Sequence, residues 1–235
     1  MSGAGTFIGI GVGPGDPELL TLKAARLIGE ADLVVYPATF ENESTARAIA
    51  VNCLREAQSE LAIRLPMQSG ERGETEAIYR RAADEISVAL DAGSTVVFLC
   101  LGDPLLYGSF IYLYELLADA HACEVVPGVS SVSAASAISL TPLTRLNQNL
   151  LVVPAFRNDE ELRHALGRHD SLVIMKVGRH RHRVVELIDA AGRHDDAVYI
   201  EHATMAGEQV IEDIARIPEG PGSYFSLFLV TRVPE

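Results

Sequence analysis

Cysteine is scarce in this sequence, and the few cysteines are scattered. The 235-residue chain has three, Cys53, Cys100 and Cys123, with no CxxC pair among them. Clustered cysteines usually mark a disulfide framework or a zinc site, so neither is expected. The histidines at 164, 169, 180 and 182 also lack a metal-binding spacing with acidic companions. We therefore predict a cytoplasmic protein with reduced, packed cysteines and no metal site.

The sequence also lacks an excess of positive charge. Lysine and arginine number 19 against 32 acidic residues, which gives a formal net charge of −13. Such a charge argues against nucleic acid or an anionic membrane as a partner. It leaves open an anionic small molecule, because a few arginines can form a local positive site. Long apolar runs and a signal-peptide pattern are missing as well, so neither a membrane span nor a leader is expected.

The most informative stretch runs from Thr95 to Phe110. Its first part, residues 95–101, is an unbroken apolar run rich in β-branched residues, which is typical of a strand buried on both faces. Gly102-Asp-Pro104 ends this strand, and residues 110–117 have the pattern of a helix. A glycine and an acid therefore follow a central strand, where open α/β sheets bind ligands. An ordinary strand-to-helix turn would explain the same residues.

A glycine-rich turn follows the first predicted strand, residues 6–12. Its glycines fall at 9, 11, 13 and 15, so the G-x-G-x-x-G spacing of dinucleotide-binding turns is absent. The acidic residue expected after the second strand is missing too, because Asp32 precedes that strand. Both observations disfavour a nucleotide-binding dehydrogenase. Two interpretations of the turn remain open: close approach of a ligand to the backbone, or tight packing of neighbouring strands.

The remaining sequence alternates between strand and helix patterns, which predicts an α/β protein. The order of these patterns suggests an N-terminal domain of residues 1–141 and a C-terminal domain of residues 142–235. Near the C-terminus, residues 209–217 and 224–232 alternate like strands, and their closeness suggests antiparallel pairing. The other predicted strands cover residues 33–36, 61–65, 124–126, 150–153, 171–176 and 197–201, and the other predicted helices cover residues 19–31, 45–53, 76–92, 132–139, 159–166 and 184–191.

A strongly basic cluster, Arg179-His-Arg-His-Arg183, stands out in this acidic chain. It leads into the predicted helix at 184–191, and positive charge at a helix N-terminus opposes the helix dipole. That mismatch favours an anionic ligand nearby. A solvated start of the helix is the alternative.

Three motifs carry a family resemblance. They are Gly11-Val-Gly-Pro-Gly-Asp-Pro-Glu-Leu-Leu-Thr-Leu-Lys-Ala24, Gly102-Asp-Pro104 and Val126-Pro-Gly-Val-Ser-Ser131. In this order they resemble the tetrapyrrole (class III) methyltransferases, and the resemblance covers nearly the whole chain. It implies two α/β domains, a mostly parallel N-terminal sheet and a mixed C-terminal sheet, with S-adenosyl-L-methionine in the cleft between them. It also implies a homodimer.

Further motifs are similar to one subgroup, the precorrin-2 methyltransferases of cobalamin synthesis. These motifs are Leu65-Pro-Met67, Tyr107-Gly-Ser-Phe-Ile-Tyr-Leu113, Met175-Lys-Val-Gly-Arg179 and Tyr224-Phe-Ser-Leu227. The similarity implies methylation of meso carbon 20 of precorrin-2 or of its cobalt form. Leu101 departs from the pattern, which has glutamate there, and Leu105-Leu106 stand where aromatic residues are usual.

The resemblance also implies which residues bind ligands. The residues expected at the cofactor, whose product is S-adenosyl-L-homocysteine, are Pro14, Leu101, Gly102, Asp103, Leu106, Tyr107, Ser130, Ser131, Val177, Ala203 and Thr204. Arg64, Lys176 and Arg179 are expected to orient the carboxylates of a small-molecule tetrapyrrole substrate. No Ser/His/Asp array is evident, and no catalytic residue is predicted. Methyl transfer from a sulfonium mainly needs alignment and exclusion of water.

Other functions remain open at this point. A different class III enzyme could act at another corrin position or, like diphthine synthases, on a protein. A protein that binds S-adenosylmethionine or a tetrapyrrole without catalysis would carry many of the same residues. A substrate assay separates these alternatives.

Overall fold

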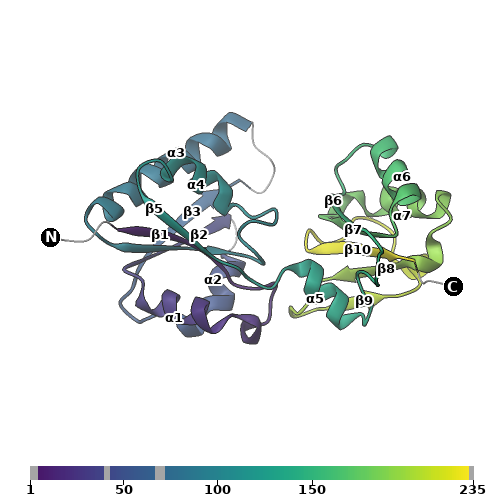
Figure 1. Cartoon of the computed structure of the whole chain (residues 1–235), viewed down its shortest axis with the longest axis horizontal. Coiled ribbons are helices and arrows are strands. Elements are labelled where there is room, and N and C mark those ends of the chain that lie inside the picture. Colours follow the sequence, from purple (N-terminus) through teal and green to yellow (C-terminus); the bar gives the residue numbers. More distant parts are fainter. Residues whose placement is uncertain (1–4, 40–42, 67–71, 233–235) are drawn as a thin grey trace. The chain divides into compact units, whose positions relative to one another are not determined.

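The computed structural model describes residues 5–39, 43–66 and 72–232, and the chain forms two compact units (Figure 1). The units are Met1–Ser130 and Ser131–Glu235. The boundary expected from the sequence, between residues 141 and 142, lies after helix α5, Ser131–Ile138, which groups here with the second unit.

A five-stranded parallel sheet forms the first unit, with the strand order β3-β2-β4-β1-β5. Its central strands β1 and β4 are buried at every position but the first, as their apolar runs predict. The strands are β1 Thr6–Gly11, β2 Leu33–Thr39, β3 Ser59–Leu65, β4 Thr95–Cys100 and β5 Ala122–Val126.

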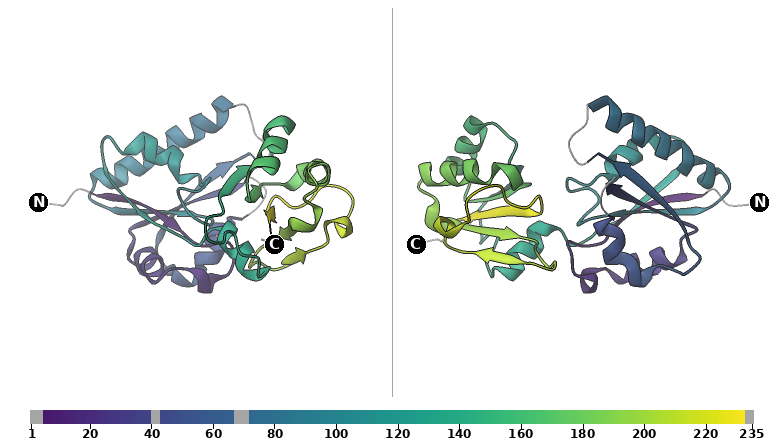
Figure 2. Two further views of the ribbon diagram at one scale, coloured as in Figure 1. Left: turned by 45° about the vertical axis from the view of Figure 1, so that its right-hand side comes forward. Right: turned by 180° about the vertical axis from the view of Figure 1, so that it is seen from behind.

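Two helices cover each face of this sheet. Helices α1 and α2 lie on one face and α3 and α4 on the other (Figure 1, Figure 2). The apolar core is accordingly divided in two, with Ile10 and Ile28 on the first side and Phe98 and Phe110 on the second. The helices are α1 Leu22–Glu30, α2 Thr45–Ala50, α3 Arg72–Asp91 and α4 Phe110–Leu117, and 3₁₀ turns cover Pro17–Leu19 and Val51–Cys53.

Helix starts in this unit follow local capping. The Ser44 hydroxyl accepts a hydrogen bond from the amide of Arg47 at 3.2 Å, which confirms the predicted start of α2. The helix expected from residue 19 begins instead at Leu22. The reason is that Thr21 caps it through the amide of Ala24, at 3.1 Å.

The crossovers change direction between strands β1 and β4. Strand β1 continues into α1 on one face, whereas the neighbouring strand β4 continues into α4 on the opposite face. Ligands of open α/β sheets bind at such a switch point, outside the carboxyl ends of the strands. A ligand-binding site is therefore expected at the loops after β1 and β4.

A five-stranded mixed sheet forms the second unit, in the order β6-β7-β10-β8-β9. Strands β6 and β7 are parallel and the other neighbours are antiparallel. The bounds are β6 Leu150–Pro154, β7 Ser171–Met175, β8 Ala197–Glu201, β9 Gln209–Ile211 and β10 Ser226–Thr231, with helices α6 Asp159–Arg168 and α7 Arg181–Ala190 and 3₁₀ turns at Gly178–His180, His194–Asp196 and Ile214–Arg216.

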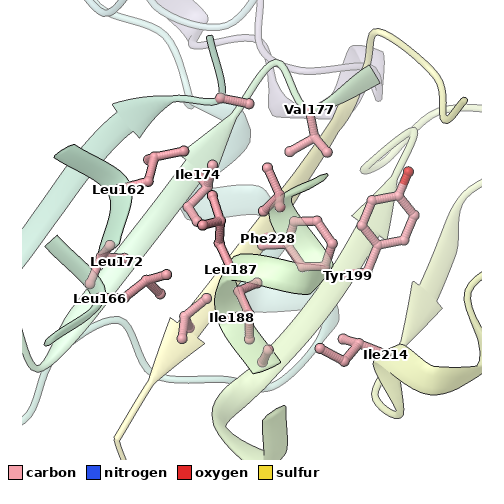
Figure 3. Packing of buried hydrophobic residues seen from close by; sticks show 14 of the residues in the cluster. Leu162, Leu166, Leu172, Ile174, Val177, Leu187, Ile188, Tyr199, Ile214 and Phe228 are labelled. Carbon is pink, nitrogen blue, oxygen red and sulfur yellow. The ribbon is translucent and has the colours of Figure 1, made fainter. Parts of the chain in front are cut away.

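The core of this unit joins the sheet to helices α6 and α7. Leu166 from α6 and Ile188 from α7 lie close to Leu172, Ile174 and Phe228 from the strands (Figure 3). All five side chains are fully buried. Burial of each is worth about 1.5–3 kcal/mol, so this cluster is a main source of the unit's stability.

The predicted pairing of the last two strands is wrong. Strand β9 pairs with β8, and β10 lies between β7 and β8. Burial explains the difference, because every residue of β10 is buried, which suits a central strand. Strand β9 is a three-residue edge strand, and Asp213 ends it by capping a 3₁₀ turn through the amide of Ala215. In the part of the chain described here, the structure holds no helix both long and apolar enough to span a membrane.

Candidate functional site

The loops after β1 and β4 are joined by a pair of hydrogen bonds. The amide of Gly102 donates to the carbonyl oxygen of Gly13 at 2.8 Å, and the amide of Gly13 donates to Gly102 at 3.3 Å. Both glycines have a left-handed backbone, with φ of 72° at Gly102 and 81° at Gly13. Such angles are unfavourable for residues with a Cβ, so the bridge depends on glycine. It lies directly at the switch point.

Glycines also let three loops cross closely at this junction. A Cβ on Gly128, in the loop after β5, would lie 2.2 Å from the Gly102 carbonyl oxygen. A Cβ on Gly11 would lie 2.5 Å from the amide nitrogen of Gly128. Real atoms do not approach so closely, so tight backbone packing explains Gly11 and Gly128.

Asp103 connects the β4 loop with the β5 loop. One carboxylate oxygen accepts from the amide of Leu105 at 2.9 Å, and the other accepts from the amide of Gly128 at 3.1 Å. Asp103 thus holds the junction in shape, a role the sequence alone did not indicate.

Other residues predicted for the site lie at the same edge of the first sheet, because the carboxyl ends of parallel strands share one edge. Pro14 is buried next to Gly13, whereas Leu106 is half-buried and Tyr107 is exposed with φ of 55°.

At the end of β3, the Arg64 guanidinium donates to the Thr39 carbonyl oxygen at 3.2 Å. Leu101 and Ser130 are half-buried in the loops after β4 and β5. Met67, of the motif that begins at Leu65, lies outside the described residues.

In the second unit the remaining predicted residues cluster at one edge of the mixed sheet. Lys176 and Val177 follow β7, and Ala203 and Thr204 follow β8, on the two sides of the first residue of β10. Lys176, His202 and Thr204 have φ of 56°, 52° and 62°. Left-handed conformations at non-glycine residues cost energy and tend to occur at functional sites. Ser131 lies elsewhere in this unit, as the first residue of α5.

The basic cluster has internal partners that the sequence did not reveal. Arg181 is 5% exposed and its guanidinium pairs with Glu201 at 3.3 Å. Arg183 pairs with Asp159 at 2.5 Å and also donates to the carbonyl oxygen of Ala155. Internal partners therefore account for the guanidinium of Arg181 and for both Nη atoms of Arg183. Arg179 is exposed, with its Nε 3.4 Å from the ring of His180.

Buried Tyr199 and half-buried Glu201, next to Arg181, have shifted pKa values. Burial raises the pKa of Tyr199 to about 12, and its hydrogen bond to Glu201 adds to the effect. Burial would also raise the pKa of Glu201. The hydrogen bonds from Tyr199 and from the amide of Ser223, together with the charge of Arg181, lower it on balance. The pair is thus a neutral phenol beside an ionised carboxylate.

A parallel α/β unit with a switch point, followed by a mixed-sheet unit, defines a two-domain α/β protein. In this class of protein, ligands bind outside the carboxyl ends of the parallel strands. The family model of the Tetrapyrrole (Corrin/Porphyrin) Methylases matches residues 6–217. The chain belongs to this family, as the sequence motifs predict.

Three relatives illustrate the similarity. The cobalamin biosynthesis protein CobIJ of Mycobacterium tuberculosis is 42% identical over 98% of this chain, which spans 46% of that protein's length. The precorrin-2 C(20)-methyltransferase of a Sinorhizobium species is 35% identical over 97% of this chain and 96% of its own. The cobalt-precorrin-2 C(20)-methyltransferase of Salmonella typhimurium is 33% identical over 97% of each.

Solved structures show the same two-unit architecture. The cobalt precorrin-4 methyltransferase CbiF superimposes with a TM-score of 0.74, at 22% identity over 96% of this chain and 94% of that one. This likeness concerns the fold alone. The uroporphyrin-III C-methyltransferase of Thermus thermophilus, complexed with S-adenosylhomocysteine, has a TM-score of 0.65 at 25% identity, over 97% of each chain.

Proposed function

We propose that this chain is an S-adenosylmethionine-dependent C-methyltransferase that methylates carbon 20 of precorrin-2 or cobalt-precorrin-2 in cobalamin biosynthesis. The two C(20)-methyltransferases support the proposal because they match over nearly their whole lengths. The structural observation that carries it is the bridge between Gly13 and Gly102 at the switch point. This is where a parallel α/β sheet binds a ligand.

The junction suits S-adenosylmethionine in its chemistry. Proteins of this family use that cofactor, and the Thermus relative was solved with its product. Gly13 and Gly102 carry no side chains, so a ligand can lie against the backbone there. The carboxylate of Asp103 is already occupied by two amides, which leaves it to shape the loops. When bound, the cofactor supplies a methyl group on a positively charged sulfur.

The protein's own contribution is alignment more than acid–base chemistry. A reduced macrocycle has nucleophilic meso carbons, so holding that carbon in line and excluding water accounts for much of the catalysis. Carbon 20 gains the methyl group and then loses its proton, which solvent can accept. Arg64, Lys176 and Arg179 are the cations we assign to the carboxylates of the macrocycle.

Methylation at another corrin position is the second candidate. It is favoured by the CobIJ relative, because this chain spans only 46% of that protein's length and the name of that protein specifies no corrin position. The experiment is to incubate the purified chain with S-adenosylmethionine and each macrocycle and to record mass spectra. One added methyl group on precorrin-2 or cobalt-precorrin-2, with an equal amount of S-adenosylhomocysteine, is expected. No mass gain on either macrocycle would contradict the proposal and favour a binding protein.

We also expect a cytoplasmic homodimer. The cysteines Cys53, Cys100 and Cys123 are free, which suits a reducing compartment. Light scattering during size-exclusion chromatography tests the dimer, and a mass equal to one chain would contradict it.

A further inference from the structure

The second unit contains a buried ion pair that methyl transfer does not require. The side chains of Arg181 and Glu201 are 6% and 12% exposed. They come from different elements, since Arg181 begins α7 and Glu201 ends β8. Replacing a buried pair with apolar residues is often neutral or stabilising, so stability alone is a weak reason for such a pair.

Glu201 gathers three donors on one oxygen. Its Oε1 accepts from the guanidinium of Arg181 at 3.3 Å, from the amide of Ser223 at 3.0 Å, and from the hydroxyl of Tyr199. A Cβ on Gly222 would lie 2.3 Å from that hydroxyl oxygen and 2.8 Å from Glu201 Oε1. The chain therefore fits closely against Glu201 at residues 222–223.

Arg181 holds the chain that leads to this point. Its Nη2 donates to the carbonyl oxygens of Pro218 at 2.6 Å and Gly220 at 2.9 Å. The planar guanidinium of arginine binds several acceptors at once in a fixed geometry. The donors of a lysine ammonium group all lie on one nitrogen and rotate, so they do not fix the acceptors in this way. The two charged residues together fix residues 218–223.

Residues 218–223 lead into Phe225 and Ser226. These two residues accept hydrogen bonds from the left-handed turns that follow β7 and β8. The amides of Val177 and Gly178 donate to the carbonyl oxygen and the hydroxyl of Ser226, at 3.3 and 3.2 Å. The amide of His202 donates to the carbonyl oxygen of Phe225 at 2.8 Å, and that of Gly222 donates to Gly178 at 3.0 Å. Displacing the segment would therefore displace both turns.

We propose that Arg181 and Glu201 are positioning residues for ligand binding. Their ion pair holds residues 218–223 so that the turns after β7 and β8 keep the geometry in which they bind the cofactor. This inference rests on the proposed function and on the expectation, implied by the family resemblance, that Val177, Ala203 and Thr204 bind S-adenosylmethionine. The competing explanation is that the pair only stabilises the second unit.

The chain offers a matched control at the opposite end of the same sheet. Arg193 is also buried, at 4% exposure, and pairs with a carboxylate, that of Asp196. It donates to the carbonyl oxygens of Leu166 at 3.0 Å and Asp170 at 2.9 Å. Asp170 precedes the first residue of β7, whereas the turn at Lys176 follows its last. Arg193→Lys should therefore reproduce the loss of stability without moving the turns.

The experiment compares Arg181→Lys with Arg193→Lys. Calorimetry gives the Kd for S-adenosylhomocysteine well below the melting temperature, and thermal unfolding gives Tm. We expect both variants to lower Tm, and Arg181→Lys alone to raise the Kd by about ten- to a hundred-fold. An unchanged Kd in folded Arg181→Lys, or an equal rise in both variants, would overturn the inference.

Glu201→Gln is the second variant, for the case in which Arg181→Lys does not fold. Glutamine keeps the shape and one acceptor but loses the charge, so a smaller rise in Kd is expected, and an unchanged Kd would again overturn the inference. The wild-type protein separates the two proposals. If wild type fails to bind S-adenosylhomocysteine, the proposed function falls together with the inference. If it binds and the variants bind equally well, only the inference falls.

Discussion

The Asp103 carboxylate accepts a hydrogen bond from the amide of Gly128, 25 residues further along the chain, at 3.1 Å. This contact ties the loop after β4 to the loop after β5 at the switch point of the first sheet. The same side chain also accepts from the amide of Leu105 at 2.9 Å. One aspartate therefore orders two of the three loops that carry the family motifs.

Removing this carboxylate should loosen both loops. We expect Asp103→Ala to lower the free energy of unfolding by about 1–3 kcal/mol, because two backbone donors lose an ionised acceptor. Asp103→Asn keeps one acceptor oxygen and should lose less. Urea unfolding of the two variants measures this, and equal stability of Asp103→Ala and wild type would refute the assigned role.

Gly128 should not tolerate any side chain. Gly128→Ala would bring a Cβ to 2.2 Å from the Gly102 carbonyl oxygen, so the loops must separate. We expect a loss of about 1–3 kcal/mol in the free energy of unfolding. Gly167, near the end of α6, has no atom within 4 Å of an added Cβ and serves as the control. Gly167→Ala should raise stability by about 0.5–1 kcal/mol, and a similar gain in Gly128→Ala would contradict the close packing.

Lys176 allows folding and binding to be separated. Both Lys176→Gly and Lys176→Ala remove the ammonium group, but only glycine relieves the left-handed backbone. We expect both variants to raise the KM for the macrocycle about ten- to a hundred-fold and to leave the Kd for S-adenosylhomocysteine nearly unchanged. The glycine variant should be the more stable of the two by about 1 kcal/mol. Arg179→Ala should show the same KM effect, and an unchanged KM would remove these cations from the substrate site.

The contribution of His194 to the stability of the protein should depend on pH. Its ring lies 2.6 Å from Asp189 and 3.5 Å from Asp213, and the hydrogen bond to Asp189 raises its pKa above 6.5 despite some desolvation. Arg216 also faces Asp213, at 3.0 Å. Because the pKa is raised, the stabilisation from His194 is complete at pH values below its pKa in the unfolded chain. The stabilisation disappears as the pH rises through its pKa in the folded protein. The Tm difference between wild type and His194→Gln should therefore be larger at about pH 5.5 than at about pH 8.5. A difference that does not change with pH would contradict this.

Local patterns were enough to predict many elements. Helix α4 and strand β8 have the predicted bounds, because their apolar residues form dense runs with clear ends. The alternation of strand and helix patterns predicted an α/β protein, and the family resemblance implied the parallel first sheet and the mixed second sheet. The position of β10 could not be predicted from its neighbours in sequence. Strand order depends on which strand is buried on both faces, and this is decided by the whole sheet.

The partners of the charged side chains could not be predicted from the sequence either. Arg181 and Glu201 are 20 residues apart, and their contact follows from the way α7 packs on the sheet. The sequence likewise left open whether the glycines serve packing or a ligand. The short approach between Gly11 and Gly128 answers this in favour of packing for these two.

The position of the transferred methyl group is the most direct test of the proposed function. Precorrin-2 is incubated with the protein and S-adenosylmethionine labelled with carbon-13 in its methyl group, and the product is analysed by NMR. Cobalt-precorrin-2 is tested in parallel. The proposal predicts a single enriched methyl group on carbon 20. An enriched methyl group on any other carbon, or none on either macrocycle, would contradict it.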